Sequence, residues 1–320
     1  MNPSFSPACW LPGPHLQTLW PVLARRRSTL PYRRERLELE DGDFLDLDWG
    51  PKAAGPLVVV LHGLEGSSRS GYVGGLMTAL AARRWQGVVM HFRGCSGEPN
   101  RLPRSYNAAD TGDLDRLVHH LGGYCAGRAL YLVGYSLGGN VLLKWLAERA
   151  YSPLPCPPRA AVAVSVPFRL EVAAARLAQG GSRLYQAYLL RRLRQSYRRK
   201  FARLDNGPVA LDKLTALTTF REFDERVTAP LHGFETAGHY YREASCRPRL
   251  RRIRCPTLLI QARDDPFMEP VVIPRAAELS PSITLEVHDR GGHVGFVEGS
   301  PWQPRYYLER RIPEFLAVHA

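Results

Sequence analysis

Short apolar runs, each followed by a stretch with helical spacing, recur along this 320-residue chain and constrain its fold more than any other feature. The run at 57–61 (LVVVL) is continuous and β-branched, which is typical of a strand buried on both faces. The alternation predicts a parallel sheet with crossover helices. Further strands are expected at 88–92, 129–133, 161–166, 257–261 and 283–287, and helices at 75–84, 111–121, 137–149 and 306–318.

Two segments depart from this alternation. Residues 36–49 alternate apolar and polar side chains around Asp41-Gly42-Asp43, which predicts an antiparallel hairpin. About ninety residues separate the strand that ends near Val166 from the strand that begins at Thr257, far more than one crossover needs. We therefore predict one domain over residues 1–320, with a helical cap inserted at 167–252.

A glycine-rich turn follows the strand at 129–133 and opens the next helix. Gly134-Tyr135-Ser136-Leu137-Gly138 matches G-x-S-x-G, the pattern of a sharp strand-to-helix turn that exposes a nucleophilic serine. The glycines supply the room that a strained serine backbone needs. The helix N-terminus favours developing negative charge. A serine in an ordinary N-cap turn is the alternative, but the flanking strand and helix favour a nucleophile.

A serine hydroxyl needs a base, and that base needs an orienting acid. In this order of elements the acid follows a late strand and the histidine follows the last one. His293 has that position. Asp264 and Asp265 are both candidates for the acid. We favour Asp265 because it lies three residues after Ala262, and we expect Asp264 to cap a turn or accept backbone hydrogen bonds.

An acyl-transfer site also needs two backbone N–H donors for the oxyanion. The amide of Leu137, directly after the serine, is one candidate. The second is the amide of Leu64 in His62-Gly63-Leu64-Glu65-Gly66, which follows the strand at 57–61. An ordinary turn is the alternative interpretation of this loop, but its position after that strand favours the oxyanion role.

Together these segments resemble the YheT-like α/β-hydrolases, which are related to animal abhydrolase-domain enzymes that act on lipid esters. The matching pieces span nearly the whole chain in the same order, and the Arg-Gly-Cys-Ser-Gly run is more specific than G-x-S-x-G. The pieces are PHLQT at 14–18, HGLEGS at 62–67, FRGCSGEPN at 92–100, GYSLGGN at 134–140, DDPF at 264–267 and GGHVGF at 291–296.

The resemblance implies an α/β-hydrolase fold, with a mostly parallel sheet, an antiparallel N-terminal hairpin, helices on both faces and an inserted helical cap. It implies Ser136, Asp265 and His293 as the catalytic triad, and it implies no cofactor and no metal. The chain departs from the family at His91, where Asn is expected. This difference affects local packing alone.

The predicted function is hydrolysis of a small-molecule carboxylic ester through an acyl-enzyme on Ser136, with lipid or acylglycerol esters as the favoured class. Two alternatives remain open. The same site could act as an acyltransferase or thioesterase, or the protein could be a non-catalytic, membrane-associated member of the fold. Epoxide hydrolysis and dehalogenation are disfavoured because they need a carboxylate in place of the serine.

The positive charge of the chain is concentrated. The formal net charge is +13, and residues 169–203 contain ten basic residues against one acidic residue, Glu171. A smaller basic group lies at 25–27 and 33–34. The first stretch has two interpretations: the solvated face of a packed cap helix, or a surface that contacts anionic membrane. No nucleic-acid recognition motif is present, so we do not expect nucleic acid as a partner.

Apolar runs and cysteines bear on location. No run approaches the roughly 18 apolar residues of a membrane-spanning helix, and residues 1–20 lack the pattern of a secretory signal. The six cysteines are scattered without a C-x-x-C pair. We therefore expect neither a zinc site nor a disulfide framework, and we interpret Cys95 as a small structural thiol. The expected location is the cytoplasm, with peripheral membrane contact as a further possibility.

Overall fold

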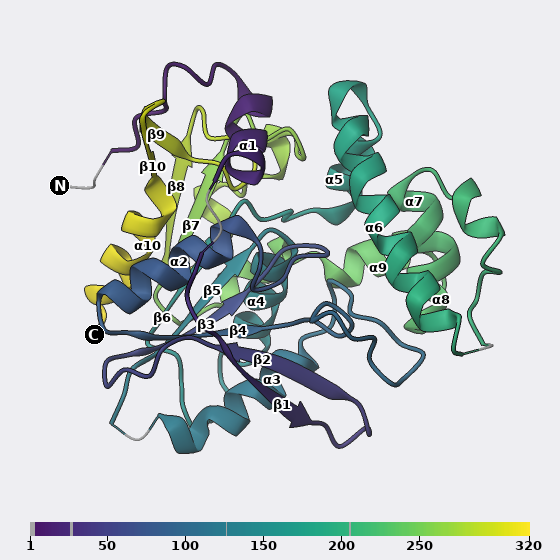
Figure 1. Ribbon diagram of the computed structural model, residues 1–320, viewed down its shortest axis with the longest axis horizontal. Coiled ribbons are helices and arrows are strands. Elements are labelled where there is room, and N and C mark those ends of the chain that lie inside the picture. Colours follow the sequence, from purple (N-terminus) through teal and green to yellow (C-terminus); the bar gives the residue numbers. More distant parts are fainter. Residues whose placement is uncertain (1–3, 26–27, 126, 205) are drawn as a thin grey trace.

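Eight strands form one twisted sheet in the order β1-β2-β4-β3-β5-β6-β7-β8 (Figure 1). The computed structural model describes residues 4–25, 28–125, 127–204 and 206–320. The strands are β1 (Arg33–Glu38), β2 (Phe44–Trp49), β3 (Leu57–Leu61), β4 (Gln86–Met90), β5 (Leu130–Tyr135), β6 (Ala160–Val164), β7 (Thr257–Ala262) and β8 (Ile283–His288).

The pairing directions confirm the predicted sheet. β1 and β2 form the antiparallel hairpin, and β2 pairs antiparallel with β4. All other neighbours in the sheet pair in parallel. The ends of β4, β5 and β6 each differ from the predicted ends by two residues, and because β4 ends at Met90, His91 and Phe92 already belong to the loop.

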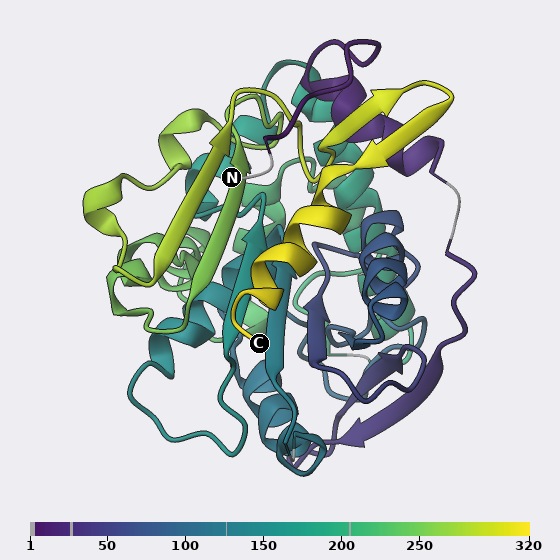
Figure 2. The same ribbon diagram turned by 90° about the vertical axis from the view of Figure 1, so that its left-hand side faces the viewer.

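Helices cover both faces of the sheet, as predicted (Figures 1 and 2). Val58 and Val60 pack with α2 (Gly71–Ala82) and α10 (Tyr307–Ala317) on one face. The alternate residues of the same strand, Val59 and Leu61, pack on the other face. There they meet α3 (Gly112–His120) and α4 (Leu137–Glu148). Because alternate side chains of a strand point to opposite faces, a continuous apolar run serves both layers.

Arg93 neutralises carboxylates from the hairpin and from α3. Arg93, in the Arg-Gly-Cys-Ser-Gly run, donates to Asp113 at 2.6 and 2.8 Å, to Asp41 at 2.7 Å and to Asp43 at 3.1 Å. The Asp41-Gly42-Asp43 turn therefore reverses the chain and also supplies two carboxylates that bind Arg93. Burial of charge requires such pairing, and this cluster fixes the 92–100 loop to the hairpin.

His91 also has a defined partner. Its Nε2 lies 2.8 Å from Asp48 Oδ2 in β2. The same carboxylate accepts hydrogen bonds from Ser68 at 2.5 Å and from Arg34 at 2.7 and 2.8 Å. These contacts hold the pKa of the Asp48 carboxyl far below its usual range, against the opposing effect of burial. The departure from Asn at position 91 thus leads to a local polar contact.

The segment between β6 and β7 is helical and lies beside the sheet (Figure 1). Its helices are α5 (Leu170–Leu177), α6 (Arg183–Phe201), α7 (Phe220–Phe223), α8 (Ala229–Leu231) and α9 (Ala237–Ala244). We call this segment the helical insertion. It has an apolar cluster of its own, against which Leu64 and Phe267 of the main body pack.

Outside the helical insertion, one α-helix and two strands were not predicted. One is the helix α1 (Pro14–Leu23), and the others are β9 (Val297–Ser300) and β10 (Gln303–Tyr306), which pair as a small antiparallel sheet. The chain before α1 is attached to this small sheet by a hydrogen bond from Ala8 N to Val297 O at 2.9 Å. Both ends of the chain therefore support the loop that carries His293.

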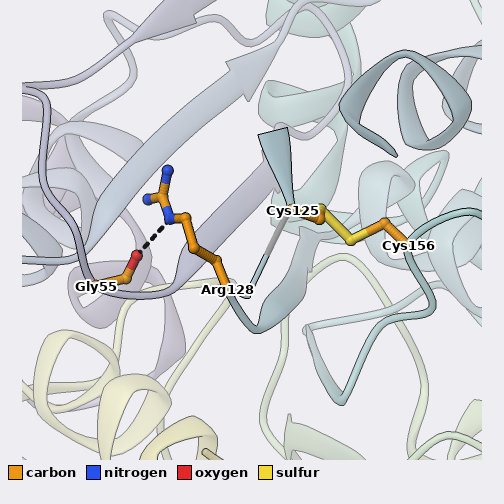
Figure 3. The surroundings of a disulfide bond; sticks show 4 residues. All are labelled: Gly55, Cys125, Arg128 and Cys156. Atoms are coloured by element: carbon orange, nitrogen blue, oxygen red, sulfur yellow. Dashed lines mark hydrogen bonds between the residues drawn. A yellow bond between two sulfur atoms is a disulfide. The ribbon is translucent and has the colours of Figure 1, made fainter. Parts of the chain in front are cut away.

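The expectation of no disulfide was wrong for one pair. Cys125 and Cys156 form a disulfide although 31 residues separate them (Figure 3). Cys125 precedes β5 and Cys156 precedes β6, and these strands pair in parallel, so their starting ends are neighbours. Spacing along the chain could not reveal this proximity. The argument for a reducing compartment loses its support, because disulfides persist in oxidising surroundings.

The same region has a second tie. Arg128 Nε, two residues before β5, donates to the carbonyl of Gly55 at 2.8 Å (Figure 3).

Within the part of the chain that the structure describes, no helix combines the length and the apolar character needed to cross a bilayer.

Candidate active site

The turn between β5 and α4 holds Ser136 in a left-handed conformation, with φ 51° and ψ −120°. The turn is so tight that a Cβ on Gly134 would lie 2.6 Å from the carbonyl oxygen of Gly138. A Cβ on Gly139 would lie 2.7 Å from a methyl group of Val166. The glycines of the GYSLGG motif are therefore required by space, and the strained, half-buried serine lies at the carboxyl end of the sheet.

The structure brings Ser136, His293 and Asp265 into one chain of contacts. The Oγ of Ser136 is 3.1 Å from His293 Nε2, and His293 Nδ1 is 2.8 Å from Asp265 Oδ2. The second carboxylate oxygen accepts the Phe267 N–H at 2.8 Å. The side chains of His293 and Asp265 are only 10% and 1% exposed. This arrangement orients the imidazole toward the hydroxyl.

Asp264 has a different environment. Its Oδ1 accepts the N–H of Gly292 at 2.9 Å. Burial raises the pKa of this carboxyl above its ordinary value. Of the two adjacent carboxylates, the structure places Asp265 against the imidazole and Asp264 against the backbone of the histidine loop. Asp265 therefore has the position predicted for the triad acid, and its catalytic role stays a prediction.

Residues of α1 support the histidine loop. The hydroxyl of Thr18 accepts the His293 N–H at 2.9 Å and donates to Pro14 O at 2.7 Å. Gln17 accepts the N–H of Val297 at 2.8 Å. A Cβ on Gly295 would lie 2.1 Å from the carbonyl oxygen of Gln17, so the loop and helix are in direct contact. The PHLQT segment carried a family resemblance, yet its role could not be read from the sequence.

Aromatic rings continue outward from His293. The ring of Phe267 stacks on the imidazole, with centroids 3.9 Å apart and planes 6° apart. Tyr185 of α6 packs on Phe267 at 4.9 Å. His15 of α1 stacks on Tyr185, and its Nδ1 is 3.0 Å from the tyrosine hydroxyl. The first turn of α6 and the first turn of α1 therefore meet above the candidate base.

The loop after β3 lies against the serine turn. A Cβ on Gly63 would be 3.3 Å from the Cβ of Ser136, and one on Gly138 would be 2.5 Å from His62 O. His62 is buried, its Nδ1 is 2.7 Å from the Gly63 carbonyl oxygen, and its Nε2 accepts the Phe92 N–H at 3.2 Å. Burial and the neighbouring His91 lower the pKa of His62 to about 3. The contacts thus require the neutral ring with its proton on Nδ1.

This contact fixes the direction of a peptide group. Because a trans peptide points its carbonyl and its N–H in opposite directions, holding Gly63 O sets the direction of the Leu64 N–H. Within the described part of the chain, the amides of Leu64 and Leu137 have no hydrogen-bond partner, whereas those of Gly63 and Glu65 bond to Tyr hydroxyls. One free donor therefore follows Ser136 directly, and the other lies in the loop that packs against the serine turn.

Glu65 connects the same loop to the helical insertion. Its backbone has φ 53°, and its carboxylate accepts the hydroxyls of Ser196 at 2.7 Å and Tyr106 at 2.9 Å. Arg192 of α6 donates to the Glu65 carbonyl at 2.8 Å. A side chain next to the candidate oxyanion donor is thus held by α6, a connection that sequence reasoning missed.

A large cavity of about 1410 Å³ contains Ser136 and His293 and extends beneath the helical insertion. Its apolar lining comes mostly from the insertion. These residues include Leu170, Ala173, Ala174, Leu177, Leu189, Leu193, Phe220, Phe223, Val227 and Leu231. A volume of this size exceeds the usual range for small-molecule sites and accommodates a long apolar group.

Two further reactive groups face the cavity. Burial raises the pKa of the Cys95 thiol well above its ordinary value, so the group stays protonated, which fits a structural role. Burial lowers the pKa of Lys200 to about 8. The Lys200 ammonium donates to Asn100 Oδ1 and to the carbonyls of Leu102 and Arg104. These contacts anchor the loop after Arg93.

A family model for the alpha/beta hydrolase fold matches residues 56–300. Together with the sheet order and the serine turn, this match defines the class: the chain belongs to the α/β-hydrolase family. Within it, the chain is a YheT-like α/β-hydrolase. YheT of Escherichia coli (strain K12) is 44% identical over 310 residues, which cover 95% of this chain and 90% of that protein.

More distant relatives agree. Phospholipase ABHD3 of Mus musculus is 29% identical over 98% of this chain and 78% of its own length. Monoacylglycerol lipase of Saccharomyces cerevisiae is 30% identical over 80% of this chain and 58% of its own length. Among solved structures, an esterase of Pyrococcus furiosus shares the fold, with a TM-score of 0.60, 18% identity, and coverage of 99% of this chain and 97% of that chain. The chain is therefore a hydrolase related to esterases and lipases.

Proposed function

We propose that this protein hydrolyses carboxylic esters through an acyl-enzyme on Ser136. The observation that carries the proposal is the continuous contact chain from Ser136 through His293 to Asp265 at the floor of an apolar cavity. The family supports hydrolytic chemistry, and the residues supply a nucleophile, a base and an orienting carboxylate.

The first half-reaction forms the acyl-enzyme. His293 Nε2 takes the Ser136 proton as Oγ attacks the ester carbonyl carbon. The carbonyl oxygen becomes an oxyanion, which accepts hydrogen bonds from the Leu64 and Leu137 amides. Asp265 holds Nδ1–H and stabilises the imidazolium. The tetrahedral intermediate then collapses, the bond to the alkoxy oxygen breaks, and His293 returns its proton to the departing alcohol.

The second half-reaction releases the acid. Water loses a proton to His293 as it attacks the acyl carbon, and the ester bond to Ser136 Oγ breaks with return of the proton to the serine. The net reaction converts one ester and one water into one acid and one alcohol. No redox partner or external cofactor is needed to balance these steps.

The substrate class follows from the cavity and the relatives. Its walls within the helical insertion are apolar, and its volume of about 1410 Å³ suits a long acyl chain. Two relatives are named for lipid substrates, a phospholipase and a monoacylglycerol lipase. We therefore favour lipid or acylglycerol esters, with the helical insertion acting as a cap over the acyl chain.

A panel of p-nitrophenyl esters of increasing chain length, together with monoacylglycerols and lysophospholipids, tests this proposal. We expect kcat/KM to rise with acyl length because each buried methylene adds about 0.8 kcal/mol of transfer free energy. Much faster turnover of short esters would contradict the lipid assignment while leaving the serine chemistry intact. Product partitioning toward an added alcohol or thiol would instead favour acyl transfer.

A further inference from the structure

Two helices beside the cavity expose large apolar side chains to solvent. Of the twelve large apolar side chains that are exposed among the described residues, six lie on α1 and on the first turns of α6. They are Leu16, Leu19, Val22 and Leu23 of α1, and Leu184 and Tyr188 of α6. Leu23 and Leu184 are 80% and 78% exposed. Apolar side chains gathered in this way, rather than scattered singly, indicate a binding surface.

The two helices are neighbours at the entrance of the cavity. His15 of α1 stacks on Tyr185 of α6, and five of the six exposed apolar residues also line the cavity: Leu19, Val22, Leu23, Leu184 and Tyr188. Figure 1 shows α1 on the same side of the molecule as the start of the helical insertion. The exposed apolar side chains therefore border the opening that leads to Ser136.

The remainder of α6 is strongly basic. Seven of its 19 residues are Arg or Lys, and none is acidic. Leu184, Tyr188, Arg191, Gln195 and Arg198 follow the helical spacing 4, 3, 4, 3 and are all exposed, so they form one stripe that passes from apolar to basic. The adjacent α1 has no Asp, Glu, Lys or Arg.

This combination identifies the chemistry of the partner. Apolar side chains without charged neighbours on α1 can enter the region of lipid acyl chains, while the arginines of α6 meet anionic headgroups. An acidic protein would match the arginines but would leave the uncharged apolar helix without a complementary surface. The charge pattern and the apolar border together favour a lipid bilayer.

We propose that the mouth surface, defined as Leu16, Leu19, Val22 and Leu23 of α1 with Leu184, Tyr188, Arg191 and Arg198 of α6, binds an anionic lipid bilayer. The cavity then opens toward the bilayer, and an ester can pass from the membrane to Ser136 without crossing water. The delivery of an ester from the bilayer to Ser136 rests on the proposed lipid-ester function. The binding of the mouth surface to the bilayer does not rest on it.

Co-sedimentation with vesicles tests the binding independently of catalysis. The full chain carrying Ser136→Ala, which cannot turn over lipid, is mixed with vesicles of phosphatidylglycerol and phosphatidylcholine or of phosphatidylcholine alone. We expect binding to the anionic vesicles, weaker binding to the neutral ones, and a loss of affinity as salt is raised.

Paired substitutions locate the surface. In the Ser136→Ala background, Leu23→Ser with Leu184→Ser should lower the partition coefficient about tenfold or more. Arg191→Gln with Arg198→Gln should lower it roughly 30-fold, because each basic residue near an anionic surface contributes about one kcal/mol. The matched controls are Val318→Ser, at the end of α10, and Arg83→Gln, at the end of α2. Val318 is 81% exposed, and each control should change the partition coefficient less than twofold. Unchanged circular dichroism and thermal midpoints establish that each variant is folded.

Three outcomes would overturn this proposal. They are the absence of sedimentation with anionic vesicles, equal losses in the control variants, and a concentration-dependent dimer that the Leu23/Leu184 pair abolishes, which would identify a second copy as the partner. In the Ser136-containing protein, Arg191→Gln with Arg198→Gln should leave hydrolysis of a short soluble ester within twofold of wild type. Absence of that hydrolysis in wild type would refute the proposed function but not the vesicle result.

Discussion

Asp264 and Asp265 show how one residue of offset along the chain decides a side chain's role. Asp265 lies beside the imidazole of His293, whereas Asp264 accepts the N–H of Gly292 in the neighbouring loop. Both carboxylates follow β7. Their different partners arise because successive side chains in this turn point in different directions. The two roles can be separated experimentally.

Exchange of each carboxylate for its amide provides the first prediction. Asp265→Asn should lower kcat about 10⁴-fold, because an amide favours the wrong imidazole tautomer and cannot stabilise the imidazolium. Asp264→Asn keeps an oxygen acceptor for Gly292 and should lower kcat less than tenfold. Steady-state hydrolysis of p-nitrophenyl butyrate measures both. Equal losses in the two variants would contradict the assignment of Asp265.

His62 provides a prediction about pH. Its pKa is lowered to about 3 in the folded protein, and the ordinary value is 6.5. Below pH 6.5 the unfolded chain binds a proton that the folded chain does not bind. The contribution of His62 to the free energy of unfolding is therefore fully present above pH 6.5 and is lost progressively as the pH decreases toward 3. Between pH 6.5 and 4.5 this residue should cost about 2 kcal/mol.

Urea unfolding at pH 6.5 and 4.5 measures this contribution. The loss of unfolding free energy in wild type should exceed that in His62→Gln by about 2 kcal/mol, because the variant has no imidazole to protonate. The comparison between the two proteins removes the contributions of other titrating groups. An identical pH dependence would show that His62 is not held neutral by its contacts with Gly63 and Phe92.

At the scale of elements, the loop after β3 links the serine turn to the helical insertion. His62 sets the direction of the Gly63–Leu64 peptide from the sheet side. Glu65 attaches the same loop to α6 through Ser196. The two attachments come from separate layers of the molecule, so the position of the candidate oxyanion donor depends on both.

Glu65→Gln tests the attachment to α6. Loss of the charge-assisted contacts should let the loop move and lower kcat about tenfold, which is less than complete loss of an oxyanion donor. KM for a short soluble ester should stay within twofold, because the Glu65 carboxylate is bonded to Ser196 and Tyr106 and acts by positioning the loop. Glu222→Gln, which alters a carboxylate within the helical insertion that bonds to Thr218 and Thr219, should change neither constant. A change in KM alone would contradict a positioning role.

The sequence was informative where a signal is local. The β-branched runs and the GYSLGG motif located the sheet and Ser136 because periodicity and turn geometry depend on adjacent residues. Thr18 and Phe267 support His293 across the fold. Their contacts depend on how α1 and the β7 loop pack, and no periodicity encodes that packing. The α1 helix escaped prediction because it has no Asp, Glu, Lys or Arg and contains Pro21, which weakens the helical pattern.

At the scale of the whole molecule, the two ends of the sheet have separate tasks. Ser136 and His293 follow the carboxyl ends of strands, where open α/β sheets place their sites. The Cys125–Cys156 disulfide joins the starting ends of β5 and β6, at the opposite end of the strands from the site. A bond at that end of the sheet contributes to stability without contacting the site.

Removal of this disulfide should therefore affect stability and spare activity. The bridge joins residues 31 apart, for which loop-closure entropy gives about 3–4 kcal/mol of stabilisation. Cys125→Ser with Cys156→Ser should lower the unfolding free energy by about that amount, with kcat/KM within twofold of wild type at 25 °C. Urea unfolding under oxidising conditions provides the measurement. A large loss of activity in a folded variant would show that the disulfide end of the sheet influences the geometry of the site at the other end.

The central claim is that Ser136 is a nucleophile activated by His293. Reaction with a fluorophosphonate, followed by mass spectrometry of the digested protein, tests it most directly, because the reagent forms a covalent adduct with an activated serine and releases fluoride. We predict one adduct per chain, on the peptide containing Ser136, with no labelling of Ser136→Ala and labelling at least 10³-fold slower in His293→Gln. Labelling at another serine, or an unchanged rate in His293→Gln, would contradict the account.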